Sequence, residues 1–279
     1  MPITGFRITS LPPPFLALGF SITLLSAPAL AEDAISPLDK EWLLGFPANA
    51  GRFIAQPLAW DREDWTNAGF VGLGLAGLLL LDDPIRDASQ DLRSDFTDAA
   101  ADVTRPFGDT ALVGAGTLGI WALGEAAEEP RLQRLGLDAL QAVIISEGFT
   151  QGLKYMIGRE RPDASGDSFE FAPLSGDRED RALPSGHATT AFAVATVIAE
   201  EYEEIPWVPW ATYGLATGTA LSRINDDEHW ATDAAVGALI GYGVGKIVSA
   251  YSPFPDDDQL SVAPVAGSQV VGLRLRLRF

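Results

Sequence analysis

The stretch HATTAFAVATVIA, residues 187–199, is uncharged and rich in alanine and threonine. Its length and lack of charge favour a helix with apolar surroundings over a strand. Five further apolar segments are similarly rich in Gly, Ala and Thr, and they cover residues 66–81, 110–124, 137–158, 207–222 and 233–251. Small side chains let helices approach closely, in soluble bundles and in membranes. The sequence therefore predicts an all-α fold, a bundle of about six apolar helices.

The lengths of the apolar segments leave open whether they cross a membrane. A bilayer span needs about 20 apolar residues, and most of the uncharged runs are shorter. Trp207 and Trp210 would suit membrane interfaces, but a buried core suits them equally. We expect a membrane-embedded bundle with short spans, and a soluble bundle is the alternative.

The first 31 residues have the features of an export signal. Arg7 is followed by an apolar run, residues 15–31, which ends in Ala29-Leu30-Ala31 and so fits an A-x-A cleavage site. An uncleaved anchor is the alternative. Cleavage removes only Arg7 among the charged residues and changes the net charge from −19 to −20. We expect an exported, periplasm-facing protein that is associated with the membrane of a Gram-negative bacterium.

The segments that flank the apolar helices divide the chain into four parts. Residues 1–31 are the signal, residues 32–65 an amphipathic segment, and residues 66–252 the helical domain. Within that domain, apolar residues three or four apart between 82 and 108 predict one amphipathic helix with an acidic outer face. They are Ile85, Ala88, Leu92, Phe96, Ala99 and Val103.

The fourth part, residues 253–279, changes period. Its end, VVGLRLRLRF, alternates apolar residues with arginine, which predicts a strand. The residues before it predict a small β-hairpin that turns near Gly267 and Ser268 and lies on the bundle surface. A terminal Phe on such a strand is also typical of outer-membrane barrels, but one hairpin cannot close a barrel.

Composition excludes several classes of function. The net charge of −19 argues against a nucleic-acid partner, which would require a basic surface. The absence of cysteine excludes disulfides and thiolate zinc sites. The chain has only two histidines, His187 and His229, so any histidine chemistry must use those positions.

Three short stretches concentrate groups that bind or transfer phosphate. In KYMIGRERP, Lys154 and Arg161 are seven residues apart, which predicts one helical face before Pro162 ends or bends the helix. In PSGH, Ser185 is a good N-cap and Gly186 allows close approach of a ligand. His187 would then lie in the first helical turn, beside an anion bound by the helix N-terminus.

The third stretch is SRINDDEHWATD. Arg223 offers a planar fork suited to phosphate. His229 and Asp233 are four residues apart, which predicts that they stack on one helical face. A carboxylate bonded to one ring nitrogen leaves the other free as a nucleophile. A surface His–Asp pair is the alternative for these two residues alone.

Together, K-x6-RP, PSGH and SR-x5-H-x3-D resemble the three-part signature of the type 2 phosphatidic acid phosphatase / vanadium haloperoxidase superfamily, in its bacterial membrane-associated lipid phosphatase branch. The motifs span Lys154 to Asp233. The resemblance implies that His229 attacks phosphorus to form a phosphohistidine, that Asp233 orients it, and that His187 protonates the leaving group.

The same resemblance assigns the phosphate-binding groups and the cofactor requirement. The phosphate oxygens would be held by Lys154, Arg161, Ser185, Gly186 and Arg223. No metal is implied, and vanadate would be a cofactor only in a haloperoxidase. We expect Glu147 to make a buried structural hydrogen bond, Asp226, Asp227 and Glu228 to form a solvated loop, and Arg159 to be an exposed charge.

These features favour an enzyme that hydrolyses a phosphate monoester or diphosphate of a membrane lipid. Undecaprenyl diphosphate, phosphatidic acid and phosphatidylglycerophosphate are the candidate substrates. The alternatives are a secreted, soluble acid phosphatase of broad specificity, a vanadium haloperoxidase, and a non-enzymatic outer-membrane or scaffold protein. The last leaves the three motifs unexplained. The sequence does not indicate an oligomeric state.

Overall fold

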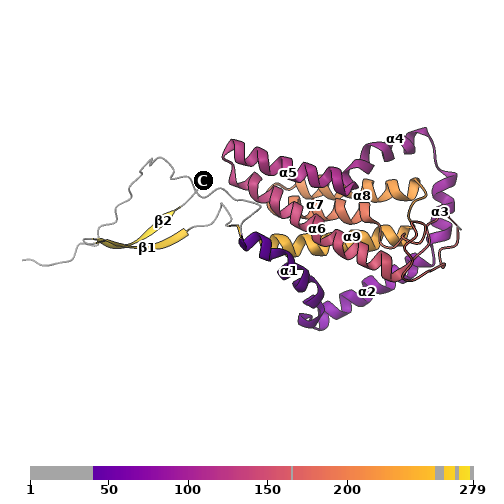
Figure 1. Cartoon of the computed structure of the whole chain (residues 1–279), viewed down its shortest axis with the longest axis horizontal. Helices are drawn as coiled ribbons and strands as arrows, with labels where there is room; N and C mark the ends of the chain where they lie inside the picture. Colours follow the sequence, from indigo (N-terminus) through magenta and orange to yellow (C-terminus); the bar gives the residue numbers. More distant parts are fainter. Residues whose placement is uncertain (1–39, 165, 255–260, 268–269, 277–279) are drawn as a thin grey trace, which may run out of the picture. The chain divides into compact units, whose positions relative to one another are not determined.

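A computed structural model describes residues 40–164 and 166–254, together with the backbone of residues 261–267 and 270–276 (Figure 1). The predicted signal, residues 1–31, lies outside these ranges. Six of the helices cover the six predicted apolar segments, so the all-α prediction is confirmed. The helices within the described ranges are α1 (Lys40–Ala55), α2 (Arg62–Leu79), α3 (Asp82–Asp91), α4 (Asp95–Thr104), α5 (Thr110–Ala127), α6 (Pro130–Ile157), α7 (Gly186–Glu201), α8 (Val208–Asn225) and α9 (Ala231–Ala250), with short 3-10 turns η1 (Gln56–Ala59) and η2 (Arg105–Gly108).

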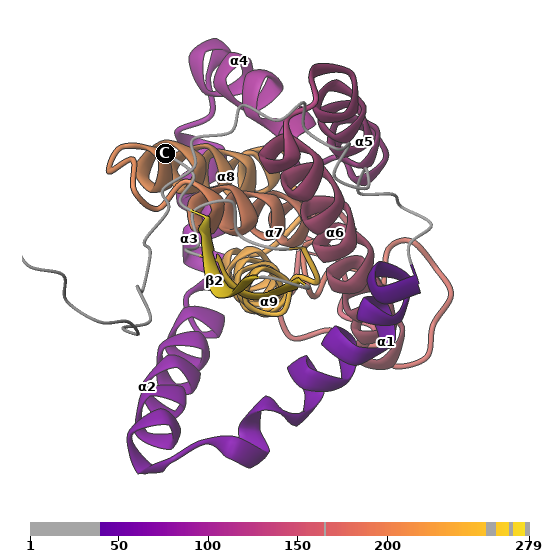
Figure 2. The ribbon, with the colours of Figure 1, turned by 90° about the vertical axis from the view of Figure 1, so that its left-hand side faces the viewer.

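The hydrophobic core lies between α6, α7 and α9. Figure 2 shows α7 in the middle of the helices, flanked by α6, α8 and α9, and α7 packs most extensively against α9. Helix α6 packs against α7 on one side and against α5 on the other. The central cluster of buried apolar side chains comprises Leu135, Ala139, Ala142, Ile145, Ala193, Val197, Ile240, Val244 and Val248.

Glycines on α9 allow its backbone to touch that of α7. A Cβ atom at Gly237 would overlap the carbonyl oxygen of Ser185, and one at Gly241 would overlap that of Thr189. Any larger residue would push the two helices apart. The close contact holds the N-terminus of α7 against the N-terminal turn of α9, and the second and third sequence motifs meet there.

The single amphipathic helix predicted for residues 82–108 was wrong. Ser94 interrupts it, because its hydroxyl accepts the amide of Thr97 while the Thr97 hydroxyl accepts the amide of Ser94, which starts α4 anew. Asp87, Asp91 and Asp102 are exposed, as an acidic outer face requires. The apolar stripe is not buried, however, since Leu92, Phe96 and Val103 are 75%, 81% and 68% exposed. Polar residues of α3 and α4 instead face the connection between α8 and α9.

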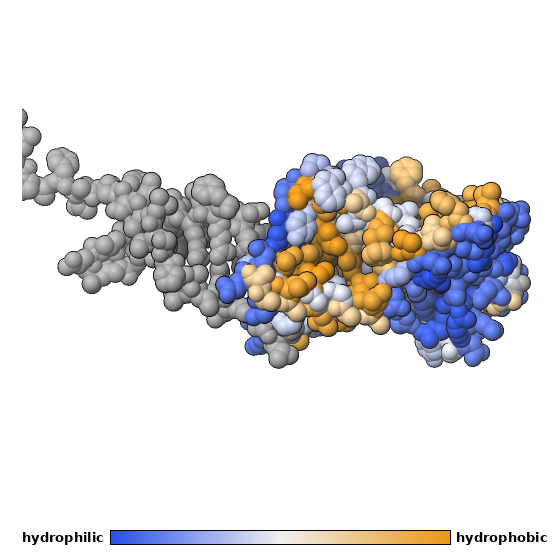
Figure 3. All heavy atoms as spheres, turned by 90° about the horizontal axis from the view of Figure 1, so that it is seen from above, coloured by the Kyte–Doolittle hydropathy of each residue, from blue (hydrophilic) through white to orange (hydrophobic). Residues whose placement is uncertain are grey.

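Apolar side chains are exposed on several other helices. Figure 3 shows them gathered over the middle of the described helices, with hydrophilic residues at the end that carries α3. Within the described ranges, α5 and α9 are long and apolar enough to cross a membrane. A third span results if α2 and α3, which are bent by 57°, count together.

The C-terminal residues pair as two antiparallel strands, β1 (Ser261–Gly267) and β2 (Val270–Arg276). Val262 is opposite Leu275, and Gly267 is opposite Val270. The connection, residues 268–269, contains the position at which the sequence predicted a turn.

Candidate active site

The N-terminus of α7 has the capped geometry that the sequence predicted. Ser185 is the N-cap, and its hydroxyl accepts the amide of Ala188 at 3.5 Å. The Ser185 amide donates to the backbone oxygen of Asp233 at 2.9 Å, which joins the second motif to the third. The described residues offer no acceptor to the amides of Gly186 and His187. Free amides at a helix N-terminus are well suited to bind an anion.

His229 and Asp233 approach each other, but not on one helix as predicted. His229 lies in the connection before α9, and Trp230 is the N-cap of that helix. The Asp233 carboxylate accepts the Trp230 amide at 2.9 Å and lies 3.6 Å from His229 Nδ1. That separation is too long for a hydrogen bond, and Nδ1 is buried without a partner. Catalytic hydrogen bonds are often long in free enzymes and tighten with substrate.

Both histidines are neutral near pH 7 in the free protein. Burial lowers the pKa of His229 well below its usual value, and the positive charges of Lys154 and Arg161 lower it further. Burial also lowers the pKa of His187 to about 4, with a second contribution from Arg223. A neutral imidazole carries the lone pair that a nucleophile needs.

Lys154 and Arg161 meet at the site from different elements, so the prediction of a shared helical face was wrong. Helix α6 ends at Ile157, because Gly158 takes a left-handed conformation with φ of 64° and reverses the chain. Lys154 Nζ donates to the backbone oxygen of Arg181 at 2.5 Å. Burial lowers the pKa of Lys154 to about 7, and the neighbouring Arg161 adds to this effect. Arg161 approaches from the loop after the helix.

The acidic residues before His229 do not form the predicted solvated loop. The Glu228 carboxylate binds Arg161, contacts Arg178 at 3.0 Å, and lies 3.8 Å from Arg223. Asp226 binds Arg223 at 2.9 Å. Glu228 thus pairs with guanidiniums from a distant part of the chain, and Asp226 pairs with one from the preceding helix, α8. Asp227, similarly, pairs with Arg86 of α3 at 2.6 Å.

Arg159 was predicted to be an exposed charge, and this was wrong. Its guanidinium is completely buried and bridges two buried carboxylates, Asp233 at 2.8 Å and Asp82 at 2.7 Å. It also donates twice to the backbone oxygen of Ser168. Asp82 in turn accepts the amide of Thr232 at 2.9 Å. Asp233, which lies beside His229, is therefore itself fixed by a residue for which the sequence predicted no role in the site.

Glu147 lies beside the N-terminus of α7. One carboxylate oxygen accepts a hydrogen bond from Gln151, but this bond is exposed, so the prediction of a buried structural hydrogen bond was wrong. The other oxygen is buried without a partner and would lie 3.5 Å from a Cβ atom at position 186. The Glu147 carboxylate therefore lies close to the backbone of Gly186, the first residue of α7.

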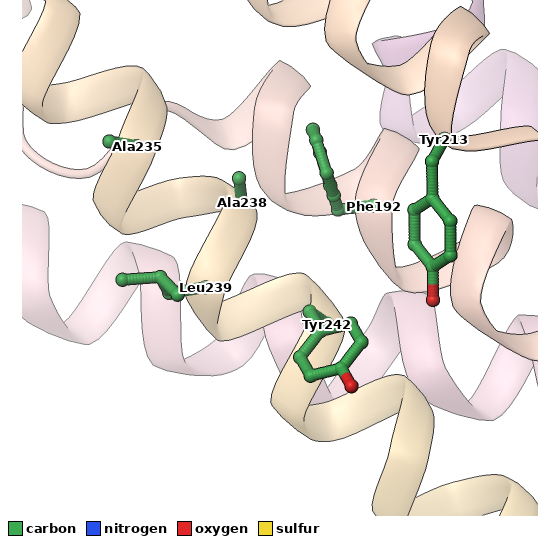
Figure 4. A pocket seen from close by; sticks show the side chains of 6 residues that line it. All are labelled: Phe192, Tyr213, Ala235, Ala238, Leu239 and Tyr242. Atoms are coloured by element: carbon green, nitrogen blue, oxygen red, sulfur yellow. The ribbon is translucent and has the colours of Figure 1, made fainter. Parts of the chain in front are cut away.

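Two hollows accompany the site. One, of about 220 Å³, is lined by the basic residues Lys154, Arg161, Arg178 and Arg181 together with Gln151. The other, of about 530 Å³, is apolar (Figure 4) and is lined by Phe192, Tyr213, Ala235, Ala238, Leu239 and Tyr242. Ala235 follows Asp233 by two residues on α9, so this helix contributes to both the apolar pocket and the histidine site. No three His, Asp or Glu side chains form a metal-binding group among the residues that the structure describes.

Comparison with known proteins gives one family match and one curated relative. Residues 135–255 match the PAP2 superfamily. The chain is similar to the lipid A 1-phosphatase of Porphyromonas gingivalis, with 37% identity over 111 residues. The matched part covers 39% of this chain and only 22% of that protein.

Two solved structures resemble the chain at low sequence identity. One is LpxE of Aquifex aeolicus, with a TM-score of 0.48 and 20% identity, covering 61% of this chain and 96% of that one. The other is the transmembrane PAP2-type phosphatidylglycerolphosphate phosphatase of Bacillus subtilis, with a TM-score of 0.47 and 18% identity. It covers 78% of this chain and 97% of its own.

Proposed function

We propose that the chain is a metal-independent phosphatase that hydrolyses a membrane lipid phosphate, and the match of residues 135–255 to the PAP2 superfamily supports this proposal. The observation that carries the proposal is the convergence of both histidines of the chain with three cations. The charges of Lys154, Arg161 and Arg223 all act on the buried His229, and Arg223 also acts on His187. A surface His–Asp pair would not be surrounded in this way.

In the first proposed step, His229 Nε2 attacks phosphorus and the bond to the lipid oxygen breaks. A bound phosphate favours the protonated form of His187, and this imidazolium gives its proton to that oxygen. The products are a phosphohistidine and the lipid alcohol or, from a lipid diphosphate, the lipid monophosphate. Asp233 orients the His229 ring through Nδ1 and stabilises the positive charge that develops on it. The short gap between His229 and Asp233 would close as this charge forms.

In the second proposed step, water attacks the phosphohistidine and His187 takes up the water proton. Inorganic phosphate leaves, and both histidines return to their starting states. Lys154, Arg161 and Arg223, with the amides of Gly186 and His187, would hold the equatorial oxygens in both steps. Removal of one such donor typically costs about 10²–10³ in rate. These groups supply the charge stabilisation, so we propose no cofactor.

The surroundings of the site favour a lipid as the substrate. The apolar pocket between α7, α8 and α9 offers space for an acyl or prenyl chain (Figure 4). Exposed apolar residues on α4 and α5, with the candidate spans, favour a membrane-embedded protein. We propose that its site faces the periplasm, in keeping with the export signal.

The proposal is tested by phosphate release from detergent-purified full-length protein in EDTA. Undecaprenyl diphosphate, phosphatidic acid, phosphatidylglycerophosphate and a water-soluble aryl phosphate are compared, each beside His229→Ala and His187→Ala. Release that survives EDTA, needs both histidines and favours a lipid supports the proposal. Equal rates on the aryl phosphate would indicate a broad acid phosphatase. Absence of release from every ester would contradict the proposal and direct the work to vanadate-dependent halogenation.

A further inference from the structure

The proposed reaction leaves two arginines beside the site without a role. Arg178 and Arg181 lie in the loop between α6 and α7 and line the basic pocket of about 220 Å³. The other cations of that pocket, Lys154 and Arg161, belong to the proposed phosphate site. Four cations therefore surround one small hollow in a chain whose net charge is −19.

The geometry of Arg178 is suited to an oxyanion. Arg178 and Arg161 both bind the carboxylate of Glu228, and Arg178 contacts its two oxygens at 3.0 Å each. Two guanidiniums thus already converge on one anionic group. The Arg178 side chain is 66% exposed, so it can turn to a ligand that approaches from outside.

Arg181 is a cation without an acidic partner. Its guanidinium donates to the side-chain oxygen of Gln151, a neutral acceptor. Among residues 40–164 and 166–254, no carboxylate lies within ion-pair distance of Arg181. Its charge instead acts on Lys154, whose pKa it helps to lower. An anion in the basic pocket would give Arg181 an ionic partner and would favour the charged form of Lys154.

One phosphate group does not need all of these cations. Lys154, Arg161 and Arg223, with the free amides of α7, are enough for the three equatorial oxygens of the reacting phosphate. We propose that Arg178 and Arg181 form a subsite for a second phosphate group of the same lipid. This inference rests on the proposed function and narrows its substrate to lipids whose headgroup carries two phosphates, either adjacent or separated by a short linker.

The test compares two lipids with identical acyl chains, dioleoyl phosphatidylglycerophosphate with two phosphates and dioleoyl phosphatidic acid with one. Farnesyl diphosphate adds the case of adjacent phosphates. Each is assayed with wild type, with Arg178→Gln/Arg181→Gln, and with Arg93→Gln. Arg93 is an exposed arginine paired with Asp98 of α4. Arg93→Gln is the control because it removes one positive charge outside the pocket.

The double variant should lose about 10- to 100-fold in kcat/KM on the two-phosphate lipids, the range expected for a lost hydrogen bond to a charged group. The loss should fall mainly on KM. Phosphatidic acid should change less than about threefold, as should every lipid with Arg93→Gln. The lipid that loses more, phosphatidylglycerophosphate or farnesyl diphosphate, shows how far apart the two phosphates lie. Equal losses on one- and two-phosphate lipids, or no loss on either, would overturn the subsite.

Competition measured on the wild type keeps the inference testable if the double variant does not fold. Inorganic diphosphate, or glycerol bisphosphate if a linker separates the two phosphates, should inhibit more strongly than inorganic phosphate, because it reaches both groups of cations. Equal inhibition constants would also overturn the subsite. Failure of the proposed function is distinct, since wild type would then release no phosphate from any lipid, or His229→Ala would release it equally well.

Discussion

Replacement of Arg159 by methionine is the most severe test of the buried charge cluster. Methionine fills similar space but leaves the carboxylates of Asp82 and Asp233 buried without a cation. Removal of one partner from a buried ion pair costs about 3–5 kcal/mol. Because the guanidinium is completely buried and both contacts are shorter than 3 Å, we expect the free energy of unfolding to fall by about this amount.

Thermal unfolding in detergent measures the effect. For a domain of this size, 1 kcal/mol corresponds to about 2–4 °C, so Arg159→Met should lower the Tm by about 6–20 °C. Arg93→Met is the matched control, since Arg93 pairs with Asp98 at the surface with side chains 41% and 44% exposed. An exposed pair contributes about 0–1 kcal/mol. If both variants melted within about 2 °C of each other, the bridge described here would be refuted.

Activity separates the positioning role of Arg159 from a purely structural one. Arg159→Lys keeps the charge but lacks the planar fork, so it cannot hold Asp82 and Asp233 together. We expect Arg159→Lys to fold, and to lose kcat while KM is unchanged, because Arg159 does not contact substrate. In a serine-protease triad, loss of the orienting carboxylate lowers kcat about 10⁴-fold, which is the upper limit here. A change in KM alone would contradict a role through Asp233.

Three further predictions concern pH, packing and competition. Because the pKa of His187 is about 4 in the free protein and a bound phosphate favours its protonated form, kcat should fall at higher pH than kcat/KM; coincident alkaline limbs would contradict its role as the acid. Gly241→Ala should lower stability by about 1–3 kcal/mol through overpacking against α7, whereas Gly214→Ala, which meets nothing within 4 Å, should be neutral or slightly stabilising in the same melting assay. Glu228→Gln removes the carboxylate that would compete with phosphate for Arg161 and Arg178, so inorganic phosphate should inhibit this variant more strongly than wild type. Glu179→Gln, at an exposed glutamate, is the control. An inhibition constant for Glu228→Gln equal to that of the control would exclude competition between Glu228 and phosphate.

Local features of the fold could be predicted from the sequence because they depend on neighbouring residues. The apolar segments marked six helices, and Ser185 marked the start of α7. The surroundings of a helix face could not be predicted, because helical periodicity identifies an apolar stripe without showing what that stripe contacts. Leu92 and Phe96 therefore fit a buried stripe in the sequence, although both are exposed in the structure.

The charge network could not be predicted because its partners are far apart in the chain. Asp82 precedes Arg159 by 77 residues, and neither residue type is commonly buried. Arg159 falls inside the K-x6-RP motif, at one of its unspecified positions. Glu228 belongs to an acidic run of the kind that is usually solvated, and only the fold brings Arg161 and Arg178 to it.

The ion pairs of the site differ in exposure, and this difference separates fixed contacts from exchangeable ones. Arg159, Asp82 and Asp233 are fully buried, so no solvent or ligand can replace their contacts. Arg161 and Glu228 are 12% and 26% exposed, and a phosphate could displace this carboxylate without burying an unpaired charge, because the Glu228 side chain already reaches solvent. The free protein thus holds Asp233, beside the proposed nucleophile, in fixed contacts, while Arg161 and Arg178 are neutralised by a carboxylate that we expect a phosphate to displace.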